Sequence, residues 1–159
     1  MALGLEEVRR RVNVDEPDYP KLAATLGVES VPQLRTLVEA DDAAVASKAA
    51  YLLSLLPSPE SLAGLEVAAR SADESVRVAA AAAFGNVTSL SAFGAGPAAA
   101  ETQLRRLLAD SDPGVRKVAL RSAEAVGPHA LRTAIEQMAS SDPEALLRRA
   151  AENVLRDLS

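Results

Sequence analysis

A pattern of apolar residues with helical spacing recurs four times along this chain of 159 residues. Each copy begins with an aspartate and continues with apolar residues at steps of three and four, which places them on one face of an α-helix. The leading residues lie 31, 39 and 30 positions apart and are Asp42, Asp73, Asp112 and Asp142. A period of about 30 residues is typical of repeat proteins in which each unit holds two helices.

A second helical pattern precedes each of these aspartates and begins near a proline. Proline fits the first turn of a helix because the N–H group that it lacks would have no partner there. The four prolines are Pro32, Pro59, Pro97 and Pro128. We expect the aspartates of the last three units to cap the second helices, at about 1 kcal/mol per cap. Each unit is therefore predicted to be a helix, a short turn and a second helix.

Neither helix of such a unit buries its apolar stripe alone, so successive pairs are expected to stack. The predicted fold is all-α: an α-solenoid, or superhelix, of about four helix–turn–helix repeats with an N-terminal helical cap. Alanine supplies 33 residues against two Phe and two Tyr, which predicts a thin core between closely spaced helices. The expected domains are the cap at 1–29 and the repeat array at 30–159, with units at 30–57, 58–87, 97–127 and 128–159 and an insertion loop at 88–96.

Two of the second-helix stretches resemble the signature of HEAT repeats, including the bacterial HEAT-like repeats named after phycobilisome lyases. They are D-P-G-V-R-K-V-A-L at 112–120 and D-E-S-V-R-V-A-A-A at 73–81. The resemblance covers residues 30–159 and implies a ladder in which the turn aspartate and the arginine after the first valine join neighbouring repeats. Carried over, this ladder consists of Asp73 with Arg77, Asp112 with Arg116, and Asp142 with Arg148. The first unit departs from the pattern, because Ala46 stands where the arginine is expected.

Residues that usually carry catalysis or bind metals are scarce in this chain. It has no cysteine and a single histidine, His129, which is too few for the usual zinc ligand sets. No nucleophile motif accompanies that histidine. We therefore predict no catalytic residue, no metal and no cofactor, and hence a protein that is not an enzyme.

The net charge indicates which classes of partner are expected, and the N-terminal stretch indicates the cellular compartment. A formal net charge of −5 disfavours nucleic acid and anionic membranes as partners, because both are bound mainly through clustered Lys and Arg. The stretch MALGLEEVRRRV places acidic residues where a signal peptide needs a basic start and an apolar run. We therefore expect a cytoplasmic protein.

Helical geometry points to one row of residues where a partner protein would bind. Steps of 100° around the second helices identify the positions that face away from the stack, and in HEAT-like arrays this row lines the concave face. The row is small and apolar in its front half and mostly basic in its rear half. A contiguous apolar surface of this kind indicates a binding site. The predicted protein-binding residues are Tyr51, Val78, Ala82, Phe93, Lys117, Leu120, Arg121 and Arg149.

A structural interpretation of the same row stands beside the functional one. The loop at 88–96 would fold back and cover the apolar residues with Leu90 and Phe93, or alanine would be present only as a helix former. Phe93 alone would be either a contact at the tip of the insertion or a plug between the second and third units.

Three functions follow from these features. The first is a non-catalytic scaffold or adaptor that binds a protein or peptide on its concave face; neither the identity of that partner nor the oligomeric state follows from the sequence. The second comes from the resemblance, since lyases that attach bilins to phycobiliproteins carry these repeats: an enzyme or enzyme subunit of the HEAT-like lyase type. The third, ranked last, is a nucleic-acid-binding HEAT-like protein.

Overall fold

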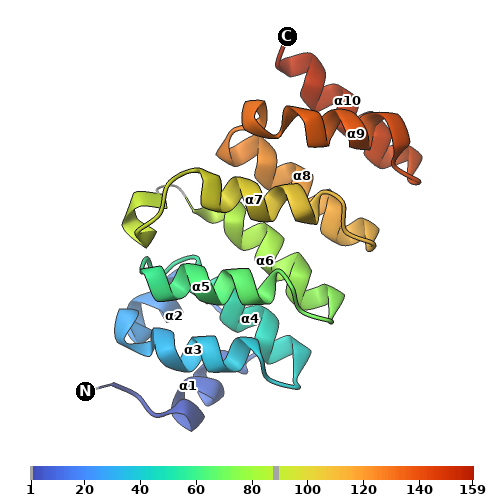
Figure 1. Ribbon diagram of the computed structural model, residues 1–159. Helices are drawn as coiled ribbons and strands as arrows, with labels where there is room; N and C mark the ends of the chain where they lie inside the picture. Colours follow the sequence, from blue (N-terminus) through green and yellow to red (C-terminus); the bar gives the residue numbers. More distant parts are fainter. Residues whose placement is uncertain (1, 88–89) are drawn as a thin grey trace.

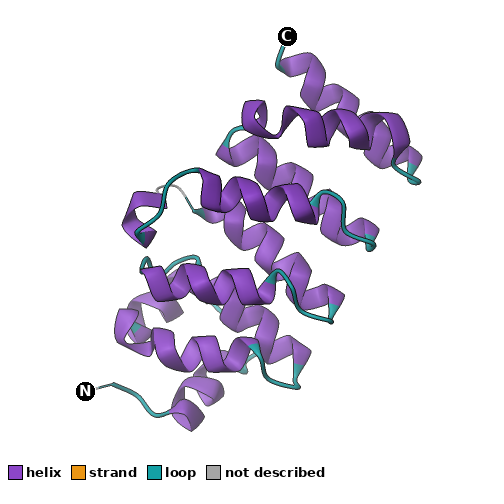
Figure 2. Ribbon diagram, in the orientation of Figure 1, coloured by secondary structure: helices purple, strands orange, loops and turns teal. Residues whose placement is uncertain are grey.

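The computed structural model describes residues 2–87 and 90–159. Every regular element within these ranges is a helix, and no strand occurs in them (Figure 1, Figure 2). The α-helices of the described residues are α1 (Leu5–Val12), α2 (Tyr19–Leu26), α3 (Val31–Val38), α4 (Ala43–Leu53), α5 (Pro59–Ala68), α6 (Glu74–Asn86), α7 (Ala98–Leu107), α8 (Pro113–Val126), α9 (Arg132–Ser141) and α10 (Ala145–Asp157). Short 3₁₀-helices, η1 to η3, lie at Val28–Ser30, Leu90–Phe93 and Pro128–Leu131.

Consecutive helices pair and stack along one direction. Figure 1 shows α3, α5, α7 and α9 in one layer and α4, α6, α8 and α10 in a second layer behind it. Helices α1 and α2 lie at the start of the stack, where both contact α4 and α1 also contacts α3. The predicted all-α solenoid of about four repeats with an N-terminal helical cap is confirmed.

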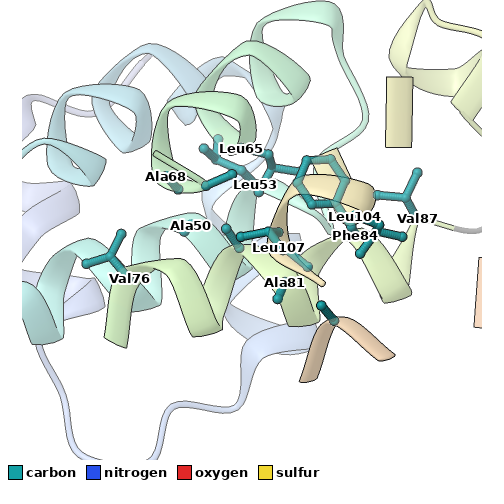
Figure 3. Close-up of a cluster of buried hydrophobic side chains, with 14 of the residues drawn as sticks. Ala50, Leu53, Leu65, Ala68, Val76, Ala81, Phe84, Val87, Leu104 and Leu107 are labelled. Atoms are coloured by element: carbon teal, nitrogen blue, oxygen red, sulfur yellow. The ribbon is translucent and has the colours of Figure 1, made fainter. Parts of the chain in front are cut away.

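The core runs between the two layers along the whole array. Its largest fully buried side chain is Phe84 of α6. In Figure 3 this ring lies among leucines of the neighbouring helices α4, α5 and α7, which are Leu53, Leu65, Leu104 and Leu107. Each helix pair thus shares its apolar side chains with the next pair, which is why the units are stable only as a stack.

Small residues let the second helices of successive units approach closely. Ala50 of α4 and Ala81 of α6 are fully buried. Ser122 of α8 donates a hydrogen bond of 2.6 Å from its Oγ to the main-chain oxygen of Ala81. A Cβ added to Gly85 would lie 2.6 Å from that Oγ, so only glycine fits there without a shift. The high alanine content therefore serves close helix packing within the second layer.

Helix caps follow the sequence pattern in three units and differ in the last. The side chains of Asp42, Asp73 and Asp112 accept backbone N–H bonds at the starts of α4, α6 and α8. The N-cap of α10 is Glu144, which makes no side-chain cap bond. Asp142 lies two residues before the cap, at the position that Asp110 occupies in the third unit. For this reason Asp142 precedes its first core residue, Leu147, by five positions, whereas Asp112 precedes Val115 by three.

The N-terminal segment also reaches the second helix layer. The ring of Tyr19, at the start of α2, lies 4.6 Å from the ring of Tyr51 on α4, measured between centroids. Lys48 of α4 donates a hydrogen bond of 2.6 Å from Nζ to the main-chain oxygen of Val14. This segment therefore covers part of the first repeat unit.

The insertion between the second and third units packs on the first layer. Residues 88 and 89 of the predicted loop lie outside the described residues. The following 3₁₀-helix η2 contacts α5, and Phe93 is 3% exposed. A Cβ added to Gly94, whose φ is +73°, would lie 2.9 Å from Cγ of Pro59. None of the described helices has both the length and the apolar character required to cross a lipid bilayer.

Candidate functional site

Two residues of the predicted protein-binding row are buried and form no free surface. Leu120 and Phe93 are each 3% exposed. Their assignment as partner contacts is therefore corrected: Leu120 belongs to the core, and Phe93 lies in the insertion that packs on α5. Two alanines on the neighbouring surface of α4 and α6, Ala50 and Ala81, are likewise fully buried where these helices pack together.

The other residues of the row are spread along the second layer. Tyr51, Val78 and Ala82 are half-buried. The start of α8 adjoins Val78, whose Cγ2 would lie 4.0 Å from a Cβ added to Gly114. The basic residues Lys117 and Arg121, one turn apart on α8, are exposed, as is Arg149 on α10. These six residues stay a prediction as partner contacts, and only the basic ones are fully accessible.

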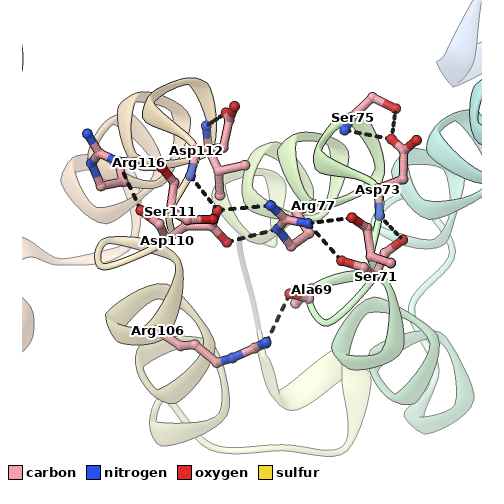
Figure 4. A network of polar contacts seen from close by, with 12 residues as sticks. Ala69, Ser71, Asp73, Ser75, Arg77, Arg106, Asp110, Ser111, Asp112 and Arg116 are labelled. Atoms are coloured by element: carbon pink, nitrogen blue, oxygen red, sulfur yellow. Dashed lines mark hydrogen bonds and ion pairs between the residues drawn. The ribbon is translucent and has the colours of Figure 1, made fainter.

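A ladder of arginine–aspartate pairs joins the last three units, and Figure 4 shows its first rung, between Arg77 and Asp110. Arg77 of α6 donates to Asp110 from Nε at 2.9 Å and from Nη2 at 3.1 Å. Arg116 of α8 donates in the same way to Asp142, at 2.8 Å and 3.0 Å. The third nitrogen of each arginine, Nη1, donates to two main-chain oxygens of its own inter-helix turn. Each guanidinium thus holds its own turn and the turn of the following unit.

The pairing differs from the one expected within single units. Asp73 and Asp112 cap their own helices and accept from the backbone N–H groups of Ser75 and Val115 at 2.8 Å and 2.9 Å. Asp142 pairs with Arg116, while Arg148 donates to the main-chain oxygen of Asp142. An arginine one turn into the second helix points along the stack, so it reaches the next turn and not its own cap.

Asp110, which pairs with Arg77, was not among the residues predicted from the sequence. A signal for it exists in the tripeptide Asp110–Asp112, where a second acid stands two residues before the cap. The preceding unit has Ser71 at this position, and the unit before that has Ala46 in place of the arginine. Donor and acceptor are therefore missing together between the first two units.

Burial and pairing act in opposite directions on the two ladder carboxylates. Burial alone would raise the pKa of Asp142, but the hydrogen bonds from Arg116, the backbone N–H of Glu144 and the nearby positive charges together outweigh it and hold the pKa below the usual value. The same balance, with Arg77 as the donor, lowers the pKa of Asp110. The side chains of Arg116 and Asp142 are only 9% and 3% exposed, so this pair is nearly removed from water. Both carboxylates are ionised at neutral pH.

A cleft of about 550 Å³ opens beside the second ladder pair. It lies between the end of α7 with the turn that follows it and the helix α9 with the turn before α10. Its lining combines polar and apolar groups, among them Arg105, Leu108, Asp110, Arg116, Met138 and Asp142. A cleft of this size lies within the range of small-molecule sites in proteins.

Neither a metal-ligand cluster nor the histidine adds a candidate site within the described part of the chain. No group of three or more His, Cys, Asp or Glu residues with metal-binding geometry occurs among residues 2–87 and 90–159. His129 lies exposed in the 3₁₀-helix η3.

Comparisons with known proteins agree with this architecture. The family model described as HEAT repeats matches residues 65–156. A similar solved structure is the complex of CpcE and CpcF of phycocyanin lyase from Nostoc sp. PCC7120, at 21% identity and a TM-score of 0.74, covering 95% of this chain and 97% of that chain. A comparison with curated proteins gives no match. At this identity the likeness shows a shared fold.

One prediction is contradicted by this comparison. We predicted that the protein is not an enzyme, because it offers few side chains for catalysis. The chain that it resembles over nearly its whole length comes from a lyase. A scarcity of His and Cys is therefore no ground for excluding an enzymatic role in a chain of this fold.

Proposed function

This chain belongs to the HEAT-repeat family, and from that membership we propose that it is a subunit of a lyase-type enzyme that works together with a second protein. The single observation that carries the proposal is a structural likeness to one chain of the complex of two proteins from phycocyanin lyase. The likeness extends over nearly the full length of this chain and of that one. HEAT-type arrays supply extended surface, so the role also requires a site for a reacting group.

We place that site in the cleft beside the second ladder pair. Its lining combines the exposed cation Arg105 with mainly apolar surface, which favours a ligand that carries an anionic substituent on an apolar body. Arg105 is exposed at this cleft, whereas the Nε and Nη2 atoms of Arg116 are already bound to Asp142. Arg105 is therefore the cation that remains for a ligand.

The proposal is tested with the protein purified from its native host under its own promoter. We expect a second protein to copurify, and the complex to change the visible absorption of phycocyanin, used as the probe because it is named for the similar complex. A change would mean that the complex releases or alters the pigment group that phycocyanin carries. If the complex leaves the spectrum unchanged, the lyase assignment is wrong.

Two matched variants test the cleft. Arg105→Glu reverses the charge at the cleft and should slow the spectral change about tenfold or more, the usual loss when a charge-assisted contact is removed. Arg70→Glu makes the same change at an exposed arginine outside the cleft lining and should leave the rate intact. Equal rates for the two variants would show that the reacting group lies elsewhere.

A further inference from the structure

The donor half of the ladder recurs in the last unit. Nη1 of Arg148 donates to the main-chain oxygens of Asp142 and Pro143 at 2.6 Å and 3.2 Å, as the equivalent atoms of Arg77 and Arg116 do in their own turns. The Nε and Nη2 atoms of those two arginines each bind a carboxylate of the following unit. The same two atoms of Arg148 have no acceptor within residues 2–87 and 90–159.

The side of α10 that carries Arg148 is also less buried than the matching side of α6 and α8. Residues four and seven positions after the ladder arginine lie on the same flank, and in α6 and α8 all of them are buried: Ala81, Phe84, Leu120 and Ala123. In α10 the matching residues are Glu152, which is exposed, and Leu155, which is half-buried. We call Arg148, Glu152 and Leu155 the end flank. Figure 1 shows α10 at the far end of the stack, with no described helix beyond it.

We propose that the end flank binds the second protein of the complex, and that this protein contributes a two-helix unit of HEAT type whose inter-helix turn carries a carboxylate. This inference rests on the proposed function, because it names the surface used by that partner. The chemistry of the occupant comes from the two complete rungs, in which a guanidinium fork binds a turn aspartate with both oxygens. Leu155 adds an apolar contact at the place where Phe84 and Ala123 are covered.

Glu152 restricts the partner further. It stands where Ala81 and Leu120 are buried in the earlier units. Covering a carboxylate is unfavourable unless it is paired, so a base on the partner, beside Arg148 one turn away on the same flank, would favour the contact. An acid in the turn and a base on the facing helix together give the partner a charge pattern opposite to that of Arg148 and Glu152.

A second copy of this chain does not supply that pattern. In a head-to-tail stack, the first unit would meet the end flank with Ala40, which occupies the position of Asp110 and Asp142. The helix α1 also contacts both helices of that unit. A copy would therefore offer Arg148 no carboxylate at the ladder position: Asp42 caps α4, and Asp41 lies one residue beyond that position. The partner that completes the rung is a different protein.

The test uses a photo-crosslinking residue, p-benzoylphenylalanine, placed at position 152 of the full chain in its native host. We expect crosslinks to one second protein, in a peptide that contains a helix–turn–helix unit with Asp or Glu in its turn. The same residue at position 67, on the exposed side of α5, serves as the control and should not reach this peptide. Crosslinks to another copy of this chain, to a downstream part of the same chain, or to a segment without an acidic turn would overturn the proposal.

Charge variants then measure how much the guanidinium of Arg148 contributes to binding of the partner. Arg148→Gln should lower the yield of the crosslinked complex about tenfold or more, as expected for loss of a charge-assisted pair. Arg132→Gln removes an exposed arginine on α9 and is the matched control. Arg148 also donates hydrogen bonds within its own turn, so its replacement could act through that turn. Glu152→Arg keeps these bonds and changes only the end flank. It is assayed by copurification of the partner and should weaken binding of the partner as well.

These outcomes separate the two proposals. If the second protein copurifies equally with native chain, Arg148→Gln and Glu152→Arg, the end flank is not the interface and the lyase proposal stands. If no second protein copurifies with the native chain, both proposals fail.

Discussion

Replacing Asp142 with alanine should detach the last helix pair from the rest of the array. Asp142 accepts two hydrogen bonds from Arg116 and one from the backbone N–H of Glu144 at 2.9 Å, at the start of α10. The last unit also packs on the third through η3, which contacts α7 and α8, but α10 itself packs mainly on α9 and only weakly on α8. The variant leaves the guanidinium of Arg116 buried without its counter-charge.

The burial of the pair sets the size of the effect. Side-chain exposures of 9% and 3% place Arg116 and Asp142 among buried ion pairs, for which removal of one partner costs about 3–5 kcal/mol. For a chain of this length, that loss lowers the melting temperature by roughly 6–20 °C. Since the cost comes from the stranded charge, replacing both residues, as Arg116→Met with Asp142→Leu, should restore much of the stability.

Urea unfolding followed by circular dichroism measures the change in free energy, and hydrogen exchange locates it. We expect exchange in α9 and α10 to accelerate more than exchange in α4 and α6, because units of a solenoid depend mainly on their neighbours. The control is Glu136→Ala, which breaks the exposed pair with Arg132 and should cost less than about 1 kcal/mol.

The reasoning is refuted in either of two ways. If Asp142→Ala costs no more than Glu136→Ala, the second ladder pair does not hold the last unit. If the double replacement is as unstable as Asp142→Ala alone, the loss comes from packing and not from an uncompensated charge.

Three further changes test other parts of the fold. Gly85→Ala should lower the unfolding free energy by about 1–3 kcal/mol, since the added Cβ meets Ser122; Ser122→Ala in the same chain should restore only part of it, because the added Cβ would still lie 3.3 Å from the Cα of that residue. Phe84→Ala should cost about 3–5 kcal/mol in urea unfolding through the cavity that it leaves, and a loss below 1 kcal/mol would mean that the ring is not buried. Acid should weaken the ladder: the lowered pKa values of Asp110 and Asp142 mean that their stabilisation is present above about pH 4 and is lost as the pH falls through the folded-state values. Urea midpoints measured from about pH 7 to about pH 2 should therefore fall more for the native protein than for the Asp110→Asn, Asp142→Asn double variant.

The helical repeat could be predicted from the sequence because its causes are local. Steps of three and four place apolar residues on one helix face, and an aspartate before the helix meets N–H groups two or three residues away, as Asp73 does with Ser75. Each unit then has to stack to bury its stripe. The all-α solenoid follows from these local rules together with the recurrence of the pattern.

The candidate site could be predicted only in part. Helix geometry placed Lys117, Arg121 and Arg149 on an exposed face, where they lie. It also placed Leu120 there, although this side chain is buried. The angle around one helix defines which residues share a face, but whether that face is covered depends on how closely the next helix approaches.

Period, helices, caps and stacking are thus properties that the chain encodes over a few neighbouring residues. The ladder joins residues 33 and 26 positions apart, and the cleft lies between elements of different units. Whether such distant residues meet depends on how successive helix pairs cross, which no local pattern specifies. Only the tertiary structure therefore decided that Arg116 bridges to Asp142 and that Arg148 keeps two donors available at the end of the array.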